Sequence, residues 1–153
     1  SWGKLALAVG MTEGAGIIGA VFTEPAVRTW YPTLIKPSFN PPNYLFGPVW
    51  TLLFALMGIA LYLIWQTKKG RAKAEALKIF YVQLGLNIAW SVLFFGLHNP
   101  LLAFVEVLVL WLAIFITIKK FIPLSPIAGW LLIPYLAWVS FAAILNLAIV
   151  QLN

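Results

Sequence analysis

The sequence predicts an all-α integral membrane protein, a bundle of five transmembrane helices with a long proline-rich first loop acting as a lid. Of the 153 residues, 63% are hydrophobic and only 9% are charged, whereas soluble domains carry roughly 25% charged residues. The apolar residues form five continuous runs, each close to the roughly 20 residues that a helix needs to cross a bilayer. A β-barrel is excluded, because its strands alternate apolar and polar residues over about 10 positions. The length leaves room for one domain, residues 1–153.

The five runs place the membrane helices at about 4–23, 47–66, 79–97, 101–121 and 127–150. The first run has no strong basic head and no clear small-residue cleavage site, so it is expected to be a span and not a signal peptide. The connection that follows it, WYPTLIKPSFNPPNYLFGPVW (30–50), holds five of the ten prolines. It is longer than ordinary connections, and its aromatic content argues against disorder. A lid over a binding site is expected here, formed by Lys36, Pro37, Phe39, Pro41 and Pro42.

The other connections are the basic segment 66–78, the tight turn 98–100 and a fourth segment around Pro123 and Pro126. In a five-helix topology, eight basic residues fall on the side of the N-terminus and only Arg28 and Lys36 on the other. The eight are Lys4, Lys68, Lys69, Arg71, Lys73, Lys78, Lys119 and Lys120. Because basic residues favour the cytoplasmic side, we expect a cytoplasmic N-terminus and an outward-facing lid in a bacterial inner membrane.

Several chemistries are excluded by composition. The chain has no Cys, no Asp, a single His (His98) and four Glu, so no thiolate site, metal site or cofactor is expected. No nucleotide-binding or hydrolase motif is present. The net charge of +6 lies in short loops between apolar spans, a pattern that reports membrane orientation and not nucleic-acid binding. The sequence has no internal repeat, so an inverted-repeat transporter is not indicated.

Polar residues on the third span form one stripe. Gln83, Asn87 and Ser91 lie four residues apart, with Trp90 on nearly the same face. Such groups either bond a neighbouring helix or face a ligand, and the pattern leaves both open.

The fifth span carries Tyr135, Trp138, Ala142 and Asn146 at helical spacing, just after Pro134, which should loosen the backbone hydrogen bonding. Trp138 lies near mid-span, where a buried indole needs a partner, so it is expected in the bundle interior as core or pocket wall.

The second span adds Trp50, Phe54 and Met57 as an aromatic face. The topology brings Trp50, Asn87, Trp90 and Trp138 toward one cavity beneath the first loop. An aromatic cavity with few polar groups suits a flat, mostly apolar ligand.

Two glutamates lie within spans. A charge at mid-bilayer costs about 2.5–3.5 kcal/mol on insertion scales, so such residues face the interior or are protonated. Glu106 is close enough to a helix end to reach the interface, whereas Glu13 is nearer mid-span. The small-residue stripes Ala6–Gly10–Gly14 and Gly85–Ala89 would permit close helix packing, within a protomer or across a dimer.

Three segments carry a resemblance that spans essentially the whole chain: the loop sequence 30–50, LeuAsnIleAlaTrpSer (86–91), and ProTyrLeuAlaTrpValSerPheAla (134–142) with LeuAsn (145–146). They resemble the TspO/MBR family, the translocator proteins once called peripheral benzodiazepine receptors. The resemblance implies a five-helix bundle, usually dimeric, that binds porphyrins such as protoporphyrin IX and benzodiazepine-type drugs. Some bacterial members are reported to degrade protoporphyrin in a light- and oxygen-dependent manner.

The resemblance also assigns residues. It implies that Trp50 and Trp138 act in that degradation, and that Gly85 and Ala89 lie on a dimer face. With the spacing arguments above, the expected ligand-binding residues are Tyr31, Trp50, Phe54, Asn87, Trp90, Tyr135, Trp138 and Ala142. Segment 145–153 lacks the Tyr followed by Lys or Arg of the animal cholesterol motif, which favours a bacterial or archaeal protein over a mitochondrial one.

The function expected first is a porphyrin-binding sensor, carrier or regulator in the membrane. An enzyme that oxidatively destroys the bound porphyrin is the main alternative, and a porphyrin or sterol transporter ranks below both.

Overall fold

The computed structural model describes all 153 residues, and every regular element in it is helical. The long helices are α1 (Trp2–Thr29), α2 (Phe46–Trp65), α3 (Arg71–Ser91), α4 (Pro100–Phe121) and, after the short α5 (Pro126–Leu131), α6 (Ile133–Leu152). Short turns are η1 (Tyr31–Thr33), η2 (Asn43–Leu45) and the π-helical η3 (Val92–Gly96). Five stretches are long and apolar enough to cross a membrane, which confirms the predicted five-helix bundle.

Two helices extend beyond their predicted ends. α3 begins at Arg71 and not near residue 79. Half of its first eight residues are charged, which lowers their hydropathy, but the segment is rich in the helix formers Ala, Lys and Glu. α1 runs from Trp2, where the Ser1 side chain accepts a hydrogen bond from the Lys4 N–H, to Thr29. Hydropathy marks the part of a helix that suits the bilayer, and both helices extend beyond that part.

The fifth span is interrupted at Leu132, two residues before Pro134. Pro134 occupies the first turn of α6, where a residue without an N–H leaves no hydrogen bond broken. The loosening expected around this proline therefore takes the form of a break between two helices.

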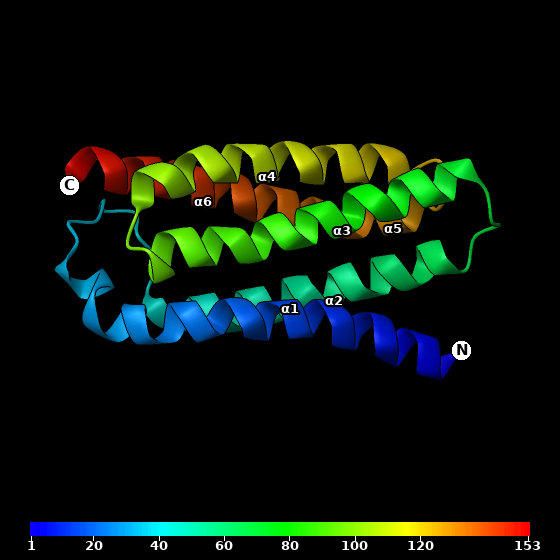
Figure 1. Ribbon diagram of the computed structural model, residues 1–153, viewed down its shortest axis with the longest axis horizontal. Coiled ribbons are helices and arrows are strands. Elements are labelled where there is room, and N and C mark those ends of the chain that lie inside the picture. The colour runs from blue at the N-terminus through cyan, green and yellow to red at the C-terminus, as the bar shows by residue number, and fades with distance from the viewer.

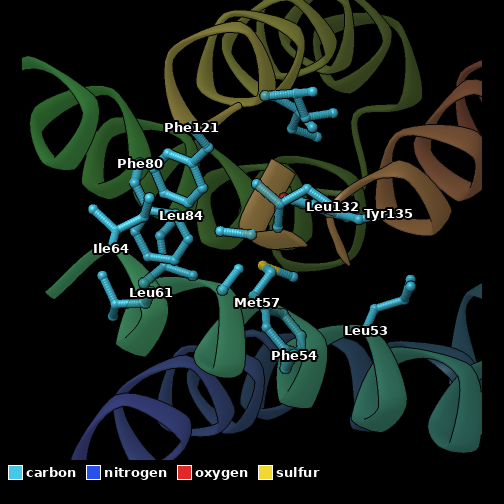
Figure 2. Close-up of a cluster of buried hydrophobic side chains, with 14 of the residues drawn as sticks. Leu53, Phe54, Met57, Leu61, Ile64, Phe80, Leu84, Phe121, Leu132 and Tyr135 are labelled. Carbon is cyan, nitrogen blue, oxygen red and sulfur yellow. The ribbon is translucent and has the colours of Figure 1, made fainter. Parts of the chain in front are cut away.

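The larger core cluster fills the half of the bundle away from the first loop. Figure 2 shows α2 side chains, among them Met57 and Leu61, facing Phe80 and Leu84 of α3, with Phe121 and Leu132 beside them. The Phe80 and Phe121 rings stack with centroids 5.7 Å apart. This solid half contrasts with the hollow half described below.

α1 and α2 approach each other most closely at Gly58. A Cβ atom built on Gly58 would lie 2.5 Å from the Val9 Cα, and the Thr12 hydroxyl donates a 2.6 Å hydrogen bond to the Phe54 carbonyl. In contrast, Gly10 and Gly14 have no atom within 4 Å of such a Cβ. The close contact within the protomer therefore uses Gly58 and not the small-residue stripe of α1.

The first loop, residues 30–45, lies at the same end of the bundle as the α3–α4 turn and the C-terminus, and the N-terminus lies at the other end (Figure 1). Trp30 stacks on His98 of that turn at 4.4 Å between ring centroids. His98 adopts a φ of 52°, in the left-handed region that a sharp turn between two helices requires. The loop is thereby packed onto a neighbouring connection.

Candidate functional site

A cavity of about 370 Å³ lies in the half of the bundle next to the first loop. Its walls come from α1, α2, α3, η3 and α6, with Tyr31 and Asn43 contributed by the loop. Sixteen of the 27 lining residues are hydrophobic. The volume lies within the roughly 300–1,000 Å³ typical of small-molecule sites. The cavity could hold a small, mostly apolar molecule.

The structure brings most of the predicted ligand-binding residues to this cavity. Those on its wall are Tyr31, Trp50, Phe54, Asn87, Trp90, Trp138 and Ala142. The exception is Tyr135, which is 1% exposed and does not line the cavity. Its ring packs edge-on behind Trp50, with centroids 6.3 Å apart. Tyr135 therefore supports the cavity wall and does not form it.

A buried hydrogen-bond chain explains the polar stripe of α3. The Asn87 side-chain amide donates to the Tyr135 hydroxyl over 2.8 Å, and that hydroxyl donates to the Gln83 Oε1 over 2.7 Å. Gln83 is 1% exposed and takes no part in the cavity wall. Asn87 bonds α6 and also lines the cavity, and Ser91 lines the cavity. The two interpretations of the stripe thus apply to different members.

The cavity tryptophans differ in their hydrogen bonding. The Trp90 indole N–H donates to Asn146 Oδ1 over 3.0 Å, and the Asn146 amide donates to the Pro100 carbonyl over 2.9 Å. These bonds join α3, α6 and α4. The indole N–H groups of Trp50 and Trp138 have no such partner within the chain, so two donors on the cavity wall remain available to a ligand.

The first loop holds its shape through a few polar contacts. Lys36 Nζ donates to the carbonyls of Tyr31 and Leu34 over 2.9 and 3.0 Å and lies 4.8 Å from the centre of the Tyr31 ring. The Tyr31 hydroxyl donates to Asn40 Oδ1 over 2.9 Å, and burial raises the pKa of Tyr31 to about 12. Lys36 therefore acts as an internal clamp of the loop.

The C-terminal residue also holds the loop. Asn153 Oδ1 accepts from the Ile35 N–H over 3.0 Å, and Asn153 Nδ2 donates to the Ile35 carbonyl over 2.8 Å. Phe39 packs edge-on against Phe141, a cavity residue, at 6.2 Å between centroids.

The predicted lid residues do not themselves line the cavity. Lys36, Pro37, Phe39, Pro41 and Pro42 lie outside it, and within residues 30–46 it is Tyr31, Asn43 and Phe46 that reach it. The Phe46 ring packs against Trp138 with centroids 6.2 Å apart. The prolines thus shape the segment that presents these three side chains.

The cavity opens sideways between α1 and α2. Ile17, 67% exposed, lines it from α1 together with the exposed Glu24, and exposed Gly47 and Thr51 line it from α2. Gly16 allows the Phe54 ring to lie directly against α1 beside this opening, since a Cβ on Gly16 would lie 2.7 Å from that ring. The opening faces the region that the bilayer would occupy.

Sequence reasoning missed the contribution of α1 and several aromatic residues. The missed aromatic cavity residues are Phe46, Phe94, Phe95 and Phe141. Phe141 follows Trp138 by three residues, a spacing that puts both on one helix face, so the signal was present. Nine residues of α1 line the cavity, whereas the sequence pattern on this helix pointed only to Glu13 and to a small-residue stripe and assigned neither to the cavity.

The remaining candidates lie elsewhere. Gly85 is exposed on α3 with no atom within 4 Å of an added Cβ, and Ala89 lies one turn away. Both carboxylate oxygens of Glu106 are buried without a hydrogen-bond partner, outside the cavity. The structure holds no cluster of three or more His, Asp or Glu side chains that could bind a metal ion.

Comparison with known proteins identifies the family to which this architecture belongs. Residues 8–152 match the TspO/MBR family. The chain belongs to the TspO/MBR family. It is 45% identical over 151 residues to the tryptophan-rich protein TspO of Chlorobaculum tepidum, covering 97% of this chain and 95% of the relative. It is 46% identical over 153 residues to the protein of the same name from Archaeoglobus fulgidus, covering 98% and 97%.

A relative in animals is similar over most of the chain. The translocator protein of Homo sapiens is 37% identical over 131 residues, which cover 84% of this chain and 78% of the human one. Membership of the TspO/MBR family and five apolar spans together make this chain a multi-pass integral membrane protein.

Proposed function

We propose that this TspO/MBR protein binds porphyrins such as protoporphyrin IX, and benzodiazepine-type aromatic compounds, and acts as a sensor, carrier or regulator. The observation that carries the proposal is the aromatic cavity of about 370 Å³ beneath a clamped loop. Trp50, Trp90 and Trp138 lie on its wall and supply flat surfaces for stacking. The two unpaired indole N–H groups suit acceptor oxygens such as carbonyls or carboxylates of the ligand.

Titration of the purified protein in detergent with protoporphyrin IX tests this proposal. Saturable binding is expected, and Trp138→Phe should weaken it about tenfold, because interfaces depend strongly on a few large aromatic contacts. Trp130→Phe is the matched control, since Trp130 is 67% exposed and lies outside the cavity. Absence of saturation, or equal affinities of the wild type and Trp138→Phe for protoporphyrin IX, would contradict the proposal.

Light- and oxygen-dependent degradation of the porphyrin is the second candidate. Trp50 and Trp138 favour it, because both line the cavity and neither indole N–H is engaged within the chain. An indole can pass an electron to an excited chromophore, with dioxygen as the oxidant, and the reactive chemistry would come from the ligand itself. Under illumination in air, the Trp50→Phe, Trp138→Phe double variant should bleach porphyrin more slowly than the wild type. Equal bleaching rates would remove this candidate.

The proposal includes the orientation of the protein in the membrane, with the N-terminus on the cytoplasmic side. The N-terminus, the 66–70 connection and the α4–α5 turn lie at one end of the bundle, which supports the interpretation of the basic residues as cytoplasmic. Labelling of single cysteines introduced at Ser38 and Lys69 in intact cells tests it. A membrane-impermeant reagent should modify the first position only.

A further inference from the structure

The cavity wall carries one carboxyl group that forms no ion pair with any basic group of the chain. Glu13 and Glu24 are the two carboxylic acids among the lining residues, and no Lys, Arg or His lines the cavity. Glu24 Oε1 lies 3.0 Å from Arg28 Nη2, one turn further along α1. Glu13 takes part in none of the three ion pairs of the chain. A ligand would therefore meet Glu13 without a partner and Glu24 already paired with Arg28.

Their depths differ as well. α1 has 28 residues, and at about 1.5 Å rise per residue Glu13 lies about 4 Å along the axis from its midpoint. Glu24 lies about 16 Å closer to the first loop by the same rise. Glu24 is exposed, whereas Glu13 is partly buried. Glu13 is thus at mid-bilayer depth and Glu24 is near the interface.

The position of Glu13 is one that stability alone does not explain. Ionisable residues are rare within spans and typically mark a ligand or ion pathway where they face a cavity. The neighbouring Thr12 hydroxyl already has the Phe54 carbonyl as its partner, so the α1–α2 contact forms without the carboxylate. The polar atoms that do fix the cavity wall, those of Asn87 and Asn146, have their own partners on α6 and α4.

We propose that Glu13 is a recognition site for a protonated amine or ring N–H group on an otherwise aromatic, apolar ligand. A carboxylate can only accept hydrogen bonds, and a charge-assisted bond is about twice as strong as a neutral one in surroundings of low dielectric constant. The aromatic wall would hold the body of the ligand and Glu13 its nitrogen. This inference rests on the proposed binding function of the cavity and adds the chemical class that the cavity selects.

A matched pair of probes tests the proposal. One is a dansyl fluorophore on a five-carbon chain that ends in a primary ammonium, and the other is the same compound acetylated at that nitrogen. The wild type should bind the ammonium probe about tenfold or more tightly than the acetylated one, as expected for a charge-assisted hydrogen bond. Glu13→Gln should abolish this preference and leave the affinity for the acetylated probe within about twofold of the wild type.

The control is Glu24→Gln, which removes a carboxylate of the same cavity that already has Arg28 as its partner. It should keep the wild-type preference. Equal affinities of the wild type for the two probes would overturn the proposal. A preference for the ammonium probe that survives Glu13→Gln, or that disappears in Glu24→Gln, would overturn it as well. Should Glu13→Gln not be recovered as a folded protein, Glu13→Ser provides the same comparison.

Binding of protoporphyrin IX to the same preparations separates this inference from the proposed function. A wild type that prefers the ammonium probe but does not bind the porphyrin supports the role of Glu13 and contradicts the porphyrin proposal. Porphyrin binding without an ammonium preference contradicts the role of Glu13 alone.

Discussion

Tyr135 shows how a single hydroxyl connects three polar residues in an apolar interior. It accepts a hydrogen bond from Asn87 and donates one to Gln83, and Gln83 Nε2 already has no partner. A buried polar group without a partner is costly where no water can replace it. The hydroxyl therefore holds α3 against α6 directly behind the cavity.

Tyr135→Phe should lower the free energy of unfolding by about 1–3 kcal/mol, because Asn87 and Gln83 both lose a partner while buried. Denaturant-induced unfolding in detergent measures the change. Tyr44→Phe is the control, since Tyr44 is 75% exposed and its hydroxyl makes no hydrogen bond within the chain. Equal stabilities of the two variants would show that the chain of hydrogen bonds contributes little.

At the scale of helices, the contact of α1 with α2 depends on the absence of one side chain. Gly58→Ala would place a methyl group 2.5 Å from the Val9 Cα, and because that atom belongs to the backbone, the two helices must move apart. Destabilisation of about 1–3 kcal/mol is expected, as for other overpacked sites. The thermal midpoint in detergent is the measurement.

Gly10→Ala is the matched control for Gly58→Ala. Gly10 lies in α1 with nothing within 4 Å of an added Cβ, so the substitution should stabilise the helix by about 0.5–1 kcal/mol. A Gly58→Ala protein as stable as Gly10→Ala would show that the two helices are not packed this closely.

The helices were predictable because apolar runs of membrane length have few other solutions. The first turns of α3, before residue 79, were not predictable in this way. Half of their residues are charged, and hydropathy does not identify a helix that lies outside the apolar run. The break at Leu132 lies two residues before Pro134, yet its position depends on packing: a Cβ on Gly129 would clash with the Ile122 Cγ1. That contact joins residues of α5 to the end of α4 and has no signature in a local pattern.

The site was predictable in part. Helical spacing and the family resemblance together identified the tryptophans of the cavity wall. Tyr135 shares a helix face with Trp138, and one turn of helix separates a supporting residue from a lining one, which periodicity cannot resolve. The lid prolines were assigned by composition, but which loop side chains reach inward depends on contacts such as those of Lys36 and Asn153 with the loop backbone.

For the whole molecule, we propose assembly into a homodimer through the surface of α3 that carries Gly85 and Ala89. Gly85 is exposed and leaves open space, and small residues let two membrane helices approach closely. The protein should be a dimer in mild detergent, and Gly85→Leu should shift it toward the monomer, as measured by sedimentation or light scattering.

Gly14→Leu is the control for the dimer prediction, because Gly14 belongs to the small-residue stripe of α1 and also has open space around it. It should leave the molar mass unchanged. A dimer dissociated by Gly14→Leu and not by Gly85→Leu would move the interface to α1, and a monomeric wild type would remove it.

The unequal lengths of α1 and α2 have a consequence for the membrane itself. With 28 and 20 residues, they measure about 42 and 30 Å, against a hydrocarbon thickness of about 30 Å. α2 matches that thickness, whereas α1 must tilt or emerge, and it tilts more as the bilayer thins. These two helices flank the sideways opening of the cavity and are packed against each other at Gly58 and at Gly16. The acyl-chain length of the surrounding lipid therefore becomes a variable that sets how wide this opening stands.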